Sequence, residues 1–146
     1  MSTENKTIMN FKDFGLSETV LHSLAKMGYT TATPIQEKAI PLAMKGRDIL
    51  GSAQTGTGKT AAFGIPMVEG ILGSPRGSAL VMTPTRELAR QVMDVIHELL
   101  GYKSRIQTAF LIGGEAMGKQ LAQLRGKPRI IVGTPGRIND HLERGT

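Results

Sequence analysis

The sequence predicts an α/β fold in which a parallel sheet is covered by helices on both faces. Short runs that are apolar throughout alternate with longer segments of helical periodicity, as in strands joined by helical crossovers. The loop after each predicted strand is rich in Gly, Thr, Pro or Arg. Because the carboxyl ends of parallel strands meet at one edge of a sheet, where ligands bind, we expect the loops SAQTGTGKT, TPTR, GGE and TPGR to lie together.

Helices precede the first predicted strand. Ser17 can cap a helix that ends before Gly28. Thr33-Pro34 opens a second helix, with proline at its first position. Since Pro41 lacks an N–H and clashes with the preceding turn, we expect this helix to stop at residue 39 and another to begin near Pro41.

Four strands then alternate with helices. The predicted strands are 48–50, 79–82, 108–112 and 129–132. The predicted helical segments are 59–72, 87–100, a segment carrying Leu121 and Leu124, and a last stretch after Gly136. The clearest is 87–100, where apolar residues recur every three or four positions and Gly101 ends the pattern.

Composition places limits on function. The chain has 146 residues, enough for one domain, and a net charge of +6, which fits contact with polyanions such as nucleic acid or anionic membrane and fits solubility alone equally well. It has no cysteine, so disulfides and thiolate metal sites are excluded. Residues 1–10 lack the apolar run of a signal peptide, and no run reaches 18 apolar residues. A cytoplasmic location is the expectation.

The strongest motif is a phosphate-binding loop between a predicted strand and a predicted helix. Its glycines let backbone N–H groups point at phosphate oxygens, and the following helix N-terminus adds partial positive charge. Lys59 would reach the β- and γ-phosphates of ATP, and the Thr60 hydroxyl would hold Mg²⁺. The ATP-binding candidates here are Ala53, Gln54, Thr55, Gly56, Thr57, Gly58, Lys59 and Thr60, the last two also being the catalytic candidates.

Two other interpretations of this loop are weaker. Gly56-x-Gly58-x-x-Ala61 fits a dinucleotide fingerprint, which needs an acidic residue about 20 positions on. No Asp or Glu occurs from Gly70 to Arg86, and that interpretation leaves Lys59 unexplained. A glycine turn without a ligand does not account for Gly-Lys-Thr between a strand and a helix.

The form AxTGxGKT, from Ala53 to Thr60, resembles the phosphate loop of DEAD-box ATP-dependent RNA helicases. The segment 28–36 resembles the family's Q motif, with Phe14 as its upstream aromatic residue and Ala32 where proline is usual. The segments 84–89, 113–114 and 134–137 resemble the family's RNA-contacting motifs. The resemblance implies a RecA-like P-loop NTPase domain that uses ATP and Mg²⁺ and binds RNA.

Gln36 has two possible roles. Its amide carries a donor and an acceptor and can pair with the adenine edge, while Tyr29 offers a flat face to the base. Thr33-x-x-Gln36 is also a capping box, in which Gln36 bonds back to its own helix end. Spacing alone favours the cap, and the family resemblance favours adenine recognition.

Arg86 and Arg137 can each form paired hydrogen bonds with a phosphate. Thr85 and Thr134 supply hydroxyls, so the surface would read the RNA backbone with little sequence preference. The alternative is that these motifs are only helix caps and turns. The RNA-binding candidates are Pro84, Thr85, Arg86, Gly113, Gly114, Thr134, Pro135, Gly136 and Arg137. The three histidines have no ligand-like spacing, and we interpret His22, His97 and His141 as ordinary.

The family's Asp-Glu-Ala-Asp motif is expected shortly after the Thr-Pro-Gly-Arg loop, but the nine residues after Arg137 do not contain it. Since its carboxylates organise Mg²⁺ and the attacking water, we expect the isolated chain to be inactive and the sheet to be incomplete at its C-terminal end. The predicted organisation is a flexible N-terminus at 1–10, a Q-motif region at 11–39 and a truncated RecA-like domain at 40–146. The alternative function is an inactive fragment that binds nucleotide or RNA.

Overall fold

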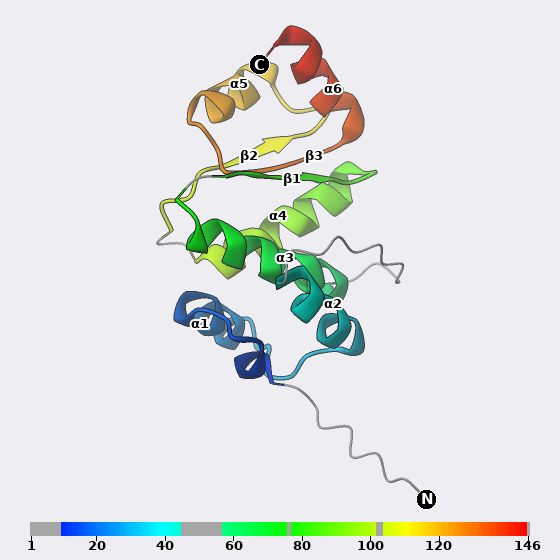
Figure 1. Ribbon diagram of the computed structural model, residues 1–146. Helices are drawn as coiled ribbons and strands as arrows, with labels where there is room; N and C mark the ends of the chain where they lie inside the picture. Colours follow the sequence, from blue (N-terminus) through cyan, green and yellow to red (C-terminus); the bar gives the residue numbers. More distant parts are fainter. Residues whose placement is uncertain (1–9, 45–56, 76, 102–103, 146) are drawn as a thin grey trace, which may run out of the picture.

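The computed structural model describes residues 10–44, 57–75, 77–101 and 104–145 (Figure 1). Within these ranges a short 3-10 helix and two helices come first, and helices and strands alternate after them. The elements are η1 (Phe11–Phe14), α1 (Glu18–Lys26), α2 (Pro34–Met44), α3 (Thr57–Gly73), β1 (Ala79–Met82), α4 (Arg86–Leu100), β2 (Thr108–Leu111), α5 (Met117–Arg125), β3 (Ile130–Gly133) and α6 (Pro135–Arg144).

The described strands form a parallel sheet in the order β1-β3-β2. Ile130, which opens β3, pairs with Ala79 of β1 on one side and with Thr108 of β2 on the other. The parallel α/β fold predicted from the sequence is therefore confirmed. The predicted strand 48–50 lies outside the described residues.

Helices lie on both faces of the sheet. Figure 1 shows α5 and α6 above the sheet, α3 and α4 below it, and α1 and α2 farther below. Because side chains alternate along a strand, Ile130 and Val132 enter the large core formed with α3 and α4. Ile131 packs instead against a small cluster that includes Ile138 of α6.

Only part of the face towards α5 and α6 is covered. On β2, Ala109 and Leu111 are buried beneath these helices. On β1, which forms one edge of the described sheet, Leu80 and Met82 are 55% and 60% exposed. The apolar sequence of this strand suggested burial on both faces, and among the described residues that expectation is wrong for β1.

The N-terminal helices are fastened to the rest of the domain by both apolar and polar contacts. Val20 and Leu24 of α1 are buried in the same core as α3 and α4. Ser17 caps α1 by accepting from the Val20 N–H, as predicted, and its own N–H and hydroxyl donate to Glu69 of α3 at 2.8 and 2.6 Å. The Q-motif region thus has a fixed position relative to α3, the helix that follows the phosphate loop.

The predicted break at Pro41 is wrong. α2 continues through this residue from Pro34 to Met44. A proline inside a helix removes a hydrogen bond and costs about 3 kcal/mol. The neighbouring Ala39 and Ile40 are buried, and α2 packs along α3, so tertiary packing offsets the local cost. α3 tolerates Pro66 in the same way, between buried Ile65 and Val68.

Candidate functional site

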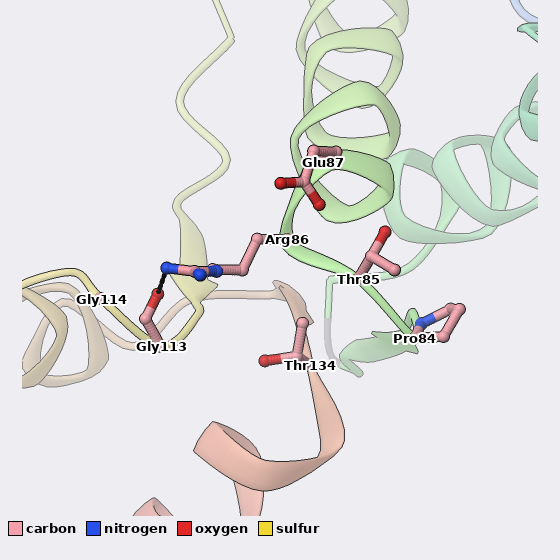
Figure 2. Close-up of a pocket in the computed structure, with 7 residues that line it drawn as sticks. All are labelled: Pro84, Thr85, Arg86, Glu87, Gly113, Gly114 and Thr134. Atoms are coloured by element: carbon pink, nitrogen blue, oxygen red, sulfur yellow. Dashed lines mark hydrogen bonds between the residues drawn. The ribbon is translucent and has the colours of Figure 1, made fainter.

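Three loops meet at the carboxyl edge of the described sheet. They follow β1, β2 and β3, and cross-strand bonds hold them in register, with Thr83 N–H donating to Gly133 O and Thr134 N–H to Leu111 O. Between them lies an open hollow of about 480 Å³. Figure 2 shows its lining residues, which are Pro84, Thr85, Arg86, Glu87, Gly113, Gly114 and Thr134.

Arg86 begins α4 and extends across the hollow to the loop after β2. Its Nη1 donates to the carbonyl oxygen of Gly113 at 3.2 Å (Figure 2). Gly114 has a φ of +84°, and a Cβ at this position would overlap Arg86 Nη1. The backbone conformation therefore favours glycine here, and a side chain would also displace the Arg86 guanidinium.

Arg137 reaches the same loop from the first turn of α6. Its Nη2 donates to Glu115 O at 3.3 Å, and its Nη1 lies 3.9 Å from the Met117 sulfur. Pro135, Gly136 and Arg137 directly follow Thr134, but they do not line the hollow itself. Each guanidinium has five N–H donors, so a bond to the loop leaves donors that can face a phosphate.

The two threonines in these loops differ. The Thr85 hydroxyl caps α4 by accepting from the Leu88 N–H at 3.2 Å, as the interpretation of this motif as a helix cap requires. Thr134 is the N-cap residue of α6, but its side chain makes no capping hydrogen bond. The Thr134 hydroxyl, which lines the hollow, is therefore available at the start of a helix, where anions bind favourably.

In the segment that resembles the Q motif, the capping box at the start of α2 is formed. Thr33 N–H donates to Gln36 Oε1 at 2.9 Å, and Gln36 N–H donates to the Thr33 hydroxyl at 3.4 Å. Gln36 is almost fully buried. The interpretation of Thr33-x-x-Gln36 as a capping box is therefore borne out.

The aromatic residues of this region lie around Phe11. Tyr29 is stacked on Phe11, with ring centroids 6.2 Å apart and planes at 22°. Phe14 meets Phe11 at 6.0 Å with the rings tilted by 58°. One face of the Tyr29 ring is thus supported by Phe11, which holds the ring in a defined orientation.

Half of the phosphate loop falls outside the described residues, namely Ala53, Gln54, Thr55 and Gly56. The described part begins with α3 at Thr57 and includes Gly58 in its first turn. Lys59 is half-buried and Thr60 is buried. A 17-residue helix that starts directly after the glycine loop fits a phosphate group at its N-terminus.

The sequence-based interpretation missed a buried polar pair beside the loop after β2. Gln120 of α5 donates to Ile112 O at 2.7 Å, and its Oε1 lies 2.8 Å from Nε2 of His141 in α6. Burial, together with the nearby Arg137 and Arg144, lowers the pKa of His141 below its ordinary value, and Asp140 opposes this shift. The available signal was helical spacing, since His141 stands three residues after the buried Ile138.

The described part of the chain contains neither a metal-binding cluster nor a membrane-spanning helix. Its His, Asp and Glu residues form no group of three or more that could hold a metal ion. None of its helices is long and apolar enough to cross a membrane.

A parallel sheet with helices on both faces, arginine-bearing loops at its carboxyl edge, and a phosphate-loop sequence leading into α3 are typical of a RecA-like domain. The family model described as DEAD/DEAH box helicase matches residues 33–146, so the chain belongs to this family. The resemblance found in the sequence is confirmed.

The chain is also similar to curated proteins of this family. It is 48% identical over 137 residues to ATP-dependent RNA helicase CshA of Listeria monocytogenes serovar 1/2a, covering 93% of this chain and 26% of that protein. It is 48% identical over 139 residues to DEAD-box ATP-dependent RNA helicase CshA of Bacillus subtilis strain 168, covering 94% and 28%. The chain thus spans about a quarter of the length of these relatives.

Two solved structures have the same fold. A DEAD box protein from the hyperthermophile Methanococcus jannaschii superposes with a TM-score of 0.85 at 42% identity, covering 94% of this chain and 38% of that one. A hypothetical ATP-dependent RNA helicase from Sulfolobus tokodaii gives a TM-score of 0.80 at 38% identity, covering 89% and 37%.

Proposed function

We propose that this chain is the nucleotide- and RNA-binding part of an ATP-dependent RNA helicase that separates short RNA duplexes in the cytoplasm. The observation that carries the proposal is the edge where three loops, two helix N-termini and two arginines meet, in a chain of the DEAD/DEAH box family. Such a surface suits a sugar–phosphate backbone. The cysteine-free composition supports a reducing compartment.

ATP and Mg²⁺ are part of this proposal. Lys59 would contact the β- and γ-phosphates, Thr60 would hold the metal, and residues 53–58 would supply backbone N–H groups. When bound, Mg²⁺ neutralises charge on the phosphates. Gln36, Tyr29 and Phe14 would select adenine.

The nucleotide proposal is tested by thermal melts with ATP and with GTP. Ligand that binds only the folded state stabilises it by about 2.7 kcal/mol at a hundred times its dissociation constant, so ATP should raise the melting temperature more than GTP. Gln36→Glu keeps the oxygen that accepts from Thr33 but loses the amide donor, so it should narrow the gap. Thr33→Ala is the control that weakens the cap and leaves the Gln36 amide in place. Equal shifts from both nucleotides in the unmutated protein would leave Gln36 as a helix cap only.

The RNA proposal is tested by filter binding of single-stranded RNAs of different composition across a salt series. Each phosphate neutralised adds about −0.7 to the slope of log affinity against log salt. Arg137→Gln should flatten the slope by about that amount and weaken all sequences equally. A strong preference for one sequence in the unmutated protein would point to base-edge recognition and contradict a backbone-binding surface.

A second candidate function is a binding fragment without catalysis. The sequence of this chain contains no Asp-Glu-Ala-Asp motif, whose carboxylates the family uses in hydrolysis. We expect the 146-residue chain alone to release no phosphate from ATP in the presence of RNA. Turnover that rises with RNA and disappears in Lys59→Ala would overturn that expectation and assign catalysis to this chain.

A further inference from the structure

The loop after β2 is held through its carbonyl oxygens by three different helices. Ile112 O accepts from Gln120 of α5, Gly113 O from Arg86 of α4, and Glu115 O from a residue of α6, Arg137. The first of these bonds differs from the other two, because Gln120 is 1% exposed, whereas the bond from Arg86 is exposed and that from Arg137 is only partly buried. The loop therefore has one anchor in the protein interior and two near the surface.

The interior anchor is itself oriented by α6. Since the Gln120 amide nitrogen donates to Ile112 O at 2.7 Å, its oxygen is the atom that faces His141 Nε2 at 2.8 Å. That oxygen can only accept, so His141 Nε2 carries the proton. An amide fixed at both ends in this way cannot rotate without leaving a buried polar group unpaired, which costs about 1–3 kcal/mol.

His141 and Arg137 are four residues apart on α6 and so project from the same side of this helix. Arg137 contacts the loop at Glu115, and His141 acts on its first residue, Ile112, through Gln120. Residues on one side of α6 thus contact the loop that carries Gly113 and Gly114, directly near its end and through Gln120 at its start. The same helix begins at Thr134, the hydroxyl-bearing residue of the hollow.

We propose that Gln120, oriented by His141, is a positioning residue for RNA binding. It fixes the carbonyl at the start of the loop, and so sets where Gly113 and Gly114 stand relative to Arg86 and to the N-terminus of α6. This role rests on the proposed function of the hollow as an RNA-binding surface. Gln120 does not itself line the hollow.

Different results are expected if Gln120 and His141 have only a structural role. If the pair only satisfies its own buried polar atoms, its removal lowers stability but leaves the RNA affinity of the folded molecules unchanged. Replacing both partners by apolar side chains of similar size would then restore part of the stability, since no unpaired group remains on either side chain and only the bond to Ile112 O is lost. A positioning role predicts that RNA affinity stays low in that double variant, because the bond to Ile112 O is still missing.

The test compares Gln120→Met, Gln120→Met/His141→Leu and the control Gln123→Met, each made in the complete gene product. The control has the same substitution one helical turn further along α5, where Gln123 bonds the Phe110 N–H in the strand instead of the loop. Three quantities are measured: the affinity for a single-stranded oligouridine, the affinity for MgATP, and hydrogen exchange of residues 112–117.

We expect Gln120→Met to weaken RNA binding about three- to tenfold, the equivalent of one hydrogen bond, with MgATP affinity unchanged. Exchange across residues 112–117 should accelerate. The double variant should recover part of the stability but not the RNA affinity or the loop protection, and Gln123→Met should leave RNA affinity and loop protection unchanged.

Unchanged RNA affinity and loop exchange in Gln120→Met, or equal effects in the control, would overturn the positioning role. If the unmutated protein binds no oligouridine, the proposed RNA function fails instead. In that case the hydrogen exchange of residues 112–117 alone decides whether Gln120 positions the loop.

Discussion

The two faces of the sheet are stabilised in different ways. Below the sheet, α3 and α4 pack with α1 in one extensive apolar core that includes Ile96, Leu99 and Ile130. Above it, the buried apolar cluster of the described residues consists of Ala109, Leu111 and Ile138 alone. The upper helices are instead connected to the sheet and its loops by side-chain hydrogen bonds: Gln120 and Arg137 donate to loop carbonyls, and Gln123 accepts from a strand N–H. His141 bonds Gln120 in turn.

Because of this difference, we expect the lower face to contribute mainly to stability and the upper face mainly to the geometry of the candidate site. Apolar burial is non-directional, so the lower face can supply free energy without fixing the angle of any loop. Hydrogen bonds are directional, and those of Gln120 and Arg137 end on carbonyl groups of the loop after β2, while Gln123 bonds the Phe110 N–H inside the strand. Changes below the sheet should therefore affect mainly the free energy of unfolding, and changes above it should affect loop geometry at smaller cost.

The largest expected effect is a leucine truncation in the lower core. Leu99 is fully buried in the large cluster, and its Cδ1 lies 3.3 Å from where a Cβ on Gly64 would stand. Leu99→Ala should cost about 3–5 kcal/mol in the free energy of unfolding, measured by urea titration. Leu111→Ala, the same change in the upper cluster, should cost about 2–3 kcal/mol because fewer side chains surround it. Equal costs would mean that the two faces do not differ in packing.

A second comparison uses two glycines, Gly133 at the end of β3 and Gly118 in α5. A Cβ on Gly133 would stand 2.5 Å from Leu111 O and 3.0 Å from Ile138 Cγ1, so it would push β2 and α6 away from β3. Gly133→Ala should cost about 1–3 kcal/mol. Gly118 lies inside α5, and a Cβ there meets no atom within 4 Å. Gly118→Ala should stabilise the protein by about 0.4–1 kcal/mol, so urea titrations of the two variants should shift in opposite directions.

The sequence predicted individual helices and strands better than their tertiary arrangement. The helix 87–100 and the strand 79–82 were predicted within a residue of α4 and β1, because local apolar periodicity determines them. The strand order β1-β3-β2 is a tertiary property that no local pattern contains. The break predicted at Pro41 was wrong for the same reason, since packing along α3 outweighs the local preference.

The candidate site could likewise be predicted from the sequence only in part. The meeting of the loops after β1, β2 and β3 followed from the parallel topology. The contacts of Arg86 with Gly113 and of Arg137 with Glu115 join residues more than 20 positions apart, so sequence alone could not show them. His141 was interpreted as ordinary because the histidines have no ligand-like spacing, and its partner Gln120 lies on a different helix, 21 residues away.

Lowering the pH should destabilise the folded protein through His141 of α6. The pKa of His141 is lowered in the folded protein by burial and by Arg137 and Arg144, against the opposing effect of Asp140. The folded state therefore binds fewer protons than the unfolded state as pH falls below about 6.5, the ordinary pKa of histidine, and stability decreases with falling pH until His141 titrates in the folded protein as well.

Melting temperatures of the unmutated protein and of His141→Leu, measured between pH 7.5 and 5, check this assignment. The variant should start less stable, because Gln120 Oε1 loses its partner, but it should show a shallower decline with acid. A decline of the same steepness in both proteins would assign the acid sensitivity to other groups.

The smallest expected effect is at the exposed contact between α4 and the loop after β2, where Arg90 lies 3.5 Å from Glu115 and its guanidinium stands 5.3 Å from the centre of the Phe110 ring. The Arg90 side chain is 61% exposed, so water and salt screen the ion pair, and such pairs contribute about 0.2–1 kcal/mol. A double-mutant cycle of Arg90→Met and Glu115→Gln should give a coupling below about 1 kcal/mol that shrinks further in 1 M salt. Glu115 also lies beside Lys119, at 3.9 Å, so Glu115→Gln alone should change stability by more than the coupling with Arg90 accounts for. A coupling that is large and insensitive to salt would show that charge pairs, and not only the directional bonds of Gln120 and Arg137, hold this loop in place.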